Sequence, residues 1–170
     1  LIVPILIQFV TQLFHRILPP KWINRLLSDT QRKIHLESAW VLTQLGLIYF
    51  LDNESLLTVY VALRTLNLAE RVGPSTELAE AYATMCVATG LIPLHSLARV
   101  YQRIALKTSQ IVNTELTTVR VSVIISLYYI GVGDWTKARV MLEKASQFCV
   151  HLGDHRLWGE SILSLANCYL

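Results

Sequence analysis

Residues 119–152 read VRVSVIISLYYIGVGDWTKARVMLEKASQFCVHL, and this stretch decides the fold. An apolar run of helical length ends at Gly133 and Asp134, and a second run follows in which Ala138 and Ala145 are seven residues apart. Glycine tolerates the left-handed backbone that ends a helix, and aspartate accepts hydrogen bonds from the N–H groups that begin the next one. The stretch therefore predicts two helices that pack as an antiparallel hairpin.

The same pattern recurs when the sequence is shifted against itself by 40 residues. Large apolar residues align with one another, and each is followed by a small residue that lets neighbouring helices approach. Each unit ends at a glycine or an asparagine, the residues that most readily close a helix. The aligned columns are Leu45, Met85, Ile125 and Leu165; Gly46, Cys86, Ser126 and Ala166; Tyr49, Thr89, Tyr129 and Tyr169; Thr58, Ala98 and Ala138; Thr65, Ala105 and Ala145; and Gly73, Asn113 and Gly153.

The sequence has this 40-residue period and no sustained alternation of apolar and polar residues of the kind that marks a β-strand. It therefore predicts an all-α chain built as an α-solenoid of antiparallel helix hairpins. We expect a helical linker or cap over residues 1–35 and a repeat array over 36–170. Its units are expected at about 39–73, 79–113 and 119–153, followed by the first helix of a further unit at 155–170. The expected helices are 2–18, 21–28, 30–51, 55–72, 75–91, 94–112, 115–131, 135–152 and 155–170.

The columns resemble the tetratricopeptide repeat. Residues 119–152 match its signature best, and LTQLGLIYF at 42–50 is the second good match. The usual repeat has about 34 residues, so the period here would extend each helix by roughly one turn. In the best match the signature positions are occupied by Ile125, Ser126, Tyr129, Gly133, Ala138 and Ala145.

A narrower resemblance is to the helical C-terminal region of large bacterial signalling ATPases. It rests on LNLAERVGPSTELAEAYATMC at 66–86, GLIPLHSLARVY at 90–101, GVGDWTKAR at 131–139 and LFHRILP at 13–19. In such proteins a nucleotide-cyclase or protein-kinase domain precedes a predicted ATPase domain and then the helical array. The resemblance implies a sensor or partner-binding arm, and the segment carries no GxxxxGK[ST] motif of its own.

In tetratricopeptide arrays the first helix of each unit lines the concave face, so the resemblance implies a partner-binding surface. A clamp for a terminal carboxylate is disfavoured, because only Arg120 and Asn167 approach the lysines and asparagines that it needs. Two alternatives remain: the apolar groove holds an amphipathic helix of a partner, anchored at Trp40 and Phe50, or it closes on itself or on its own polypeptide as core. The expected partner-binding residues are Trp40, Leu47, Phe50, Glu80, Val87, Arg120, Val123, Leu127, Ile130 and Asn167.

Composition excludes several other classes of function. The net charge of +3 has no basic stripe with interleaved aromatics, which argues against nucleic acid as a partner. Three scattered cysteines suit a reducing cytoplasm, and no Cys/His spacing indicates a metal. We therefore expect a non-enzymatic cytoplasmic segment without cofactor or metal, whose partner is a protein, a peptide or another domain of the same polypeptide. The oligomeric state is left open.

The N-terminal stretch LIVPILIQFVTQLFHRIL has the apolar character of a membrane span but carries a polar side at helical spacing. Gln8, Gln12 and His15 form that side, so an amphipathic helix docked on protein is favoured over a span of about 20 apolar residues. Membrane contact is accordingly not expected. Two further functions stay open: a free-standing adaptor, and a membrane-surface adaptor that uses residues 1–33 with their basic side chains.

Overall fold

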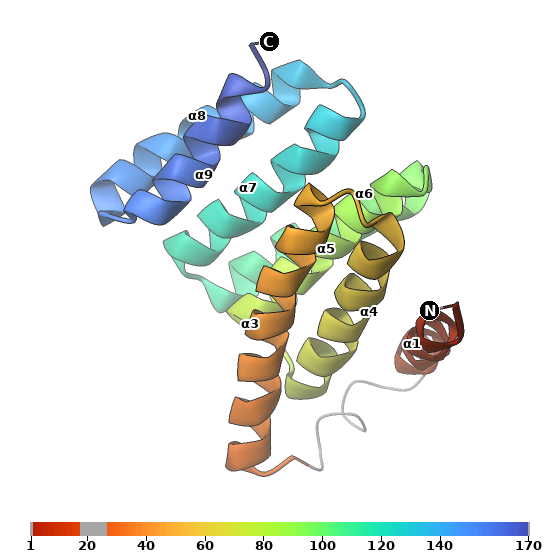
Figure 1. Cartoon of the computed structure of the whole chain (residues 1–170). Coiled ribbons are helices and arrows are strands. Elements are labelled where there is room, and N and C mark those ends of the chain that lie inside the picture. The colour runs from red at the N-terminus through yellow and green to blue at the C-terminus, as the bar shows by residue number, and fades with distance from the viewer. Residues whose placement is uncertain (1, 18–26, 170) are drawn as a thin grey trace.

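The structure is a computed structural model that describes residues 2–17 and 27–169. Within these ranges it is all-helical and contains no strand, which confirms the all-α prediction (Figure 1). The helices are α1 (Ile2–Ile17), α3 (Asp29–Leu51), α4 (Ser55–Val72), α5 (Thr76–Leu91), α6 (His95–Val112), α7 (Glu115–Gly131), α8 (Trp135–Leu152) and α9 (His155–Ala166).

Consecutive helices pack as antiparallel pairs, and the pairs stack on one another. α3 packs with α4, α5 with α6, and α7 with α8, while α9 packs on α8. The first helices also contact each other in order, α3 with α5, α5 with α7, and α7 with α9, so they form one layer (Figure 1). Side chains that point from this layer away from α4, α6 and α8 therefore share one face of the molecule.

The main core lies where α4, α5, α6 and α7 meet. Leu66, Ala83 and Ile125 are completely buried there, and Ala98 and Ala105 of α6 are equally buried against α5. A smaller core, centred on Leu142, joins α7, α8 and α9. Small side chains at the helix contacts let the backbones approach, and the large neighbours fill the remaining space.

The turns use the backbone chemistry expected of them. Gly73, Asn113, Gly133 and Gly153 all have positive φ, and Asn113 and Gly153 adopt the left-handed conformation that ends α6 and α8. Asp134 and Asp154 accept hydrogen bonds from the N–H groups of Lys137 and Leu157, which caps α8 and α9. Both Gly-Asp pairs therefore separate helices.

The bounds of four described helices differ from the prediction, and two of these, α5 and α6, each begin one residue later than expected, at Thr76 and His95. α3 begins one residue earlier, because Ser28 and Gln31 form a reciprocal capping box, so the expected helix 21–28 does not include residues 27 and 28; its remainder, 21–26, lies outside the described residues. α9 ends at Ala166 rather than running to 170, and the Asn167 N–H closes it on the carbonyl of Leu163.

α3 is the one helix among the described residues that is long and apolar enough to cross a membrane, judged by length and composition alone. Its buried residues, Ala39 and Gly46, are small. Val61 of α4 lies beside Gly46, where an added Cβ would be 3.5 Å from Val61 Cγ1. α3 thus packs on α4 and α5 with small residues at its closest contacts, while large apolar side chains such as Trp40 and Leu47 stay exposed.

Candidate functional site

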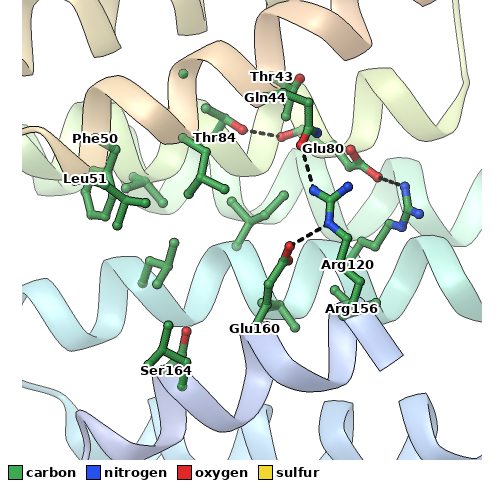
Figure 2. Close-up of a pocket in the computed structure, with 18 of the residues that line it drawn as sticks. Thr43, Gln44, Phe50, Leu51, Glu80, Thr84, Arg120, Arg156, Glu160 and Ser164 are labelled. Atoms are coloured by element: carbon green, nitrogen blue, oxygen red, sulfur yellow. Dashed lines mark hydrogen bonds and ion pairs between the residues drawn. The ribbon is translucent and has the colours of Figure 1, made fainter. Parts of the chain in front are cut away.

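A cavity of about 390 Å³ lies between the first helices of the hairpins. α3 and α9 form two opposing walls, and α5 and α7 form the floor between them (Figure 2). These helices reach the same space because each contacts the next within one layer. The cavity therefore draws on residues from Trp40 to Asn167 and exists only in the stacked arrangement.

Apolar side chains on the floor of the cavity are buried, whereas large apolar side chains on its walls are exposed. Val87 and Val123 on the floor are only 9% and 6% exposed, but Trp40 and Leu163 on the walls are 48% and 70% exposed. Phe50 lies between these extremes as a half-buried side chain. A closed core would bury its walls as completely as its floor, so this surface has room for further apolar atoms.

One end of the cavity carries an ion pair across the floor. Glu80 of α5 and Arg120 of α7 are 40 residues apart in sequence, and their Oε1 and Nη1 atoms are 3.3 Å apart. Glu80 is buried, with a side chain 8% exposed, while the Arg120 side chain is 34% exposed. Burial raises the pKa of the Glu80 carboxyl, and the attraction of the Arg120 guanidinium offsets only part of that rise.

A second arginine joins the two walls at the same end. Arg156 of α9 donates from Nη2 to Gln44 Oε1 of α3 at 2.6 Å, and from Nε to Glu160 Oε1 at 3.0 Å (Figure 2). Phe50 and Leu51 lie at the opposite end of the cavity in this view. The cavity is thus polarised along its length, with charged groups at one end and apolar groups at the other.

The structure brings nine of the ten expected partner-binding residues to this cavity. They are Trp40, Leu47, Phe50, Glu80, Val87, Arg120, Val123, Leu127 and Asn167. Ile130 does not line it; it packs against the smaller core of α7, α8 and α9. A binding role for the nine stays a prediction, since the geometry shows where they lie and not what they bind.

Several cavity residues were not among the expected ones. Gln44, Arg156 and Ser164 line the cavity without having been expected there. The i,i+4 spacing of Arg156 and Glu160, which is typical of an ion pair on one helix, is the signal that could have indicated one of them. The Arg156–Gln44 hydrogen bond joins residues 112 apart in sequence. No local pattern could have predicted it, because it depends on the curvature of the whole stack.

The residues expected to be structural occupy contrasting environments. Gly46, Ala98, Ala105, Ala138 and Ala145 are buried at helix contacts. Tyr49 and Tyr129 are half-buried, and the Tyr129 hydroxyl accepts a hydrogen bond from Gln102 Nε2 at 2.7 Å. Tyr169 is 65% exposed, because α9 ends before it.

The Cys86 thiol, beside the cavity-lining Val87, is poorly suited to nucleophilic chemistry. Cys86, next to Val87 in α5, is fully buried, and burial raises the pKa of its thiol to about 12. It stays protonated at neutral pH and is not a nucleophile. Among residues 2–17 and 27–169, no three His, Cys, Asp or Glu side chains come together in a way that could hold a metal ion.

The chain matches no family model, no curated protein and no solved structure.

Proposed function

We propose that this chain is a non-catalytic protein-interaction module whose cavity receives an apolar segment of a partner. The observation that supports it most strongly is the contrast between the buried floor and the exposed apolar rim, with Leu163 70% exposed at its edge. Burial of such side chains is the main source of affinity in helix-in-groove recognition.

The partner segment that fits best is an amphipathic helix. The walls α3 and α9 are themselves helices, and a helix laid between them would place its apolar side chains over Val87, Val123 and Leu127. The polar end formed by Glu80, Arg120 and Arg156 would fix the direction of that helix by pairing with its charged residues. Apolar area would supply affinity, and the polar end would supply orientation.

For the fold, we propose an α-solenoid of the tetratricopeptide type with a 40-residue period. In its support, the second helices α4, α6 and α8 begin at Ser55, His95 and Trp135, which are 40 residues apart. The Glu80–Arg120 ion pair also joins equivalent positions of consecutive units. In such arrays each unit contacts mainly its neighbours, and the exposed concave face binds partners.

For the context, we propose a cytoplasmic arm of a larger signalling ATPase, cyclase-like or kinase-like. Binding of a partner in the cavity would shift the conformational equilibrium of a distant catalytic domain only if the partner binds two states of the arm with different affinity. The Arg156–Gln44 hydrogen bond between α9 and α3 is a contact that such binding would make or break. A free-standing adaptor that uses the same cavity is the second candidate.

The test uses a displayed library of amphipathic helical peptides, selected on the intact chain and measured by fluorescence polarisation. Trp40→Ala and Leu163→Asp are expected to weaken the selected peptides more than about tenfold, because truncated or charged groups at a buried anchor cost several kcal/mol. Leu152→Asp is the matched control: Leu152 is exposed on α8 and does not line the cavity.

Two results would contradict the proposal. Selected peptides that bind all variants equally would place their site elsewhere on the chain. A Trp40→Ala variant that loses stability by as much as a core truncation, measured by urea unfolding, would show that the rim is closed core and not a groove.

A further inference from the structure

α1 docks on the rest of the chain through its polar side. Gln12, which is 4% exposed, donates to Asn67 Oδ1 at 3.0 Å and to Glu70 Oε2 at 2.6 Å. Asn67 donates in return to the backbone oxygen and to Oε1 of Gln8, both at 2.9 Å. His15 Nδ1 is 2.9 Å from Glu70 Oε2. These bonds hold α1 on α4 in one rotational setting.

The consequence is that the apolar side of α1 points away from the protein. Eight of its large apolar side chains are 47–69% exposed. Leu6, Val10 and Leu13 lie at the centre of this face, on the side of the helix opposite Gln8 and Gln12 by α-helical periodicity. Water-soluble helices normally bury such a face, so this continuous apolar surface marks an interaction site.

The length of α1 sets how it would meet a bilayer. Its 16 residues give a helix of about 24 Å, which is shorter than the roughly 30 Å of a hydrocarbon core. Its polar side is also occupied by bonds to α4. A helix of this kind lies in the plane of the membrane surface with its apolar face down.

The charge around α1 complements anionic lipid headgroups. Residues 2–17 contain no Asp or Glu, and the Glu70 carboxylate that bonds to Gln12 and His15 of α1 has a side chain only 10% exposed. Arg64 is exposed on α4 about one turn before Asn67, and its Nη1 donates to the neutral hydroxyl of Tyr60 at 2.9 Å. Each basic residue near an anionic surface adds to membrane affinity.

We propose that the exposed face of α1 is an in-plane anchor for an anionic membrane surface. A second copy of the chain would also cover the apolar face. Pairing α1 with itself across a two-fold axis, however, leaves the lack of acidic residues in α1 unexplained. A lipid surface accounts for the apolar face and for the charge together.

The experiment is co-sedimentation of the whole chain with vesicles of phosphatidylcholine alone, or of three parts phosphatidylcholine to one part phosphatidylserine. The chain is expected to bind the mixed vesicles more tightly, and salt should weaken that binding. Leu6→Asp with Leu13→Asp should lower binding by more than about tenfold. Val41→Asp with Ile48→Asp is the matched control, since these apolar residues of α3 are equally exposed and also seven apart.

The contribution of positive charge to membrane binding is tested by two arginine variants. Arg64→Gln should lower binding to the mixed vesicles roughly fivefold, whereas Arg99→Gln, an exposed arginine on α6, should not. All variants are checked by circular dichroism, and exposed positions are chosen so that the fold is kept.

Three outcomes would overturn the proposal. Equal binding to both kinds of vesicle would show that the chain does not recognise anionic lipid. An equal loss in both aspartate pairs would show unspecific adhesion of apolar surface. Self-association that Leu6→Asp with Leu13→Asp abolishes, measured by analytical ultracentrifugation without any vesicle binding, would assign the face to a second copy.

Discussion

α5 and α3 are both first helices of a hairpin, and both carry apolar residues around most of their circumference, yet their burial differs sharply. Eleven residues of α5 are buried, whereas α3, which is longer, buries only Ala39 and Gly46. α5 is surrounded by α3, α4, α6 and α7, while α3 packs on α4 and α5. Position in the stack, and not apolar character, decides which helix becomes core and which becomes a wall of the cavity.

The side chains of the two helices match these positions. α5 is rich in alanine, and Ala79, Ala81 and Ala83 are fully buried where other helices approach it. α3 instead carries the bulky Trp40 and Leu47 on the cavity side, where no helix lies against them. A helix that is packed on every side needs small residues, and a helix that binds needs large ones.

The largest expected effect on stability comes from truncating Met85 of α5, and Leu45 of α3 at the equivalent repeat position is its comparison. Met85→Ala in α5 should lower the free energy of unfolding by about 2–4 kcal/mol, because it leaves a cavity in close-packed core. Leu45→Ala in α3, at the same column but only half-buried, should cost roughly 1–2 kcal/mol. Urea unfolding monitored by circular dichroism measures both, and equal losses would contradict the contrast between the two helices.

The glycines of the two helices provide the next test. A Cβ at Gly90 of α5 would lie 2.6 Å from Cδ2 of the buried Tyr128, so Gly90→Ala should destabilise the chain by about 1–3 kcal/mol through overpacking. A Cβ at Gly46 of α3 would make an ordinary 3.5 Å contact with Val61. Gly46→Ala is therefore expected to be neutral or to stabilise by up to about 1 kcal/mol through helix propensity.

The melting temperature of the Gly90→Ala variant should fall, whereas that of the Gly46→Ala variant should stay the same or rise. A Gly90→Ala variant as stable as the parent would mean that Tyr128 leaves its place between α5 and α7 at little cost.

The smallest expected effect is a pH dependence that belongs to α5. Burial raises the pKa of Glu80 above its ordinary value of 4.5, so the folded chain binds this proton more tightly than the unfolded chain. Stability from this group is therefore full below pH 4.5 and is lost as the pH rises through the raised folded pKa. Glu80→Gln should flatten that slope in urea unfolding at stepped pH, whereas the exposed Glu37→Gln of α3 should leave it unchanged. A slope that survives Glu80→Gln would assign it to another group.

The sequence predicted helix positions well because its signals are local. Asn113 and Gly153 have the backbone conformation that their residue types favour, and Asp134 and Asp154 cap the helices that follow them. Two of the misplaced boundaries, the start of α3 at Asp29 and the end of α9 at Ala166, depend on the capping box of Ser28 and on the turn that begins at Asn167. Helix ends are the least reliable part of any such prediction, since single hydrogen bonds decide them.

The candidate site was predictable in part. Glu80 and Arg120 were both expected on the concave face and are one 40-residue period apart, and the structure joins them directly. The sequence did not predict that Gln44 and Arg156 meet across the cavity, or that Ile130 turns toward another core. Those features depend on how far each hairpin rotates relative to the last, and the sequence pattern contains no such angle.

The sequence alone determined the helices, their turns and the residues that face a common side, because periodicity and turn chemistry act over a few residues. The tertiary structure alone decided which apolar faces are covered. It buries α5, leaves the walls of the cavity open, and turns the polar side of α1 inward against Asn67 and Glu70. Burial depends on what packs against a face, and the hydrogen bonds of Gln8, Gln12 and His15 to α4 hold α1 in an orientation that its apolar residues would not have predicted.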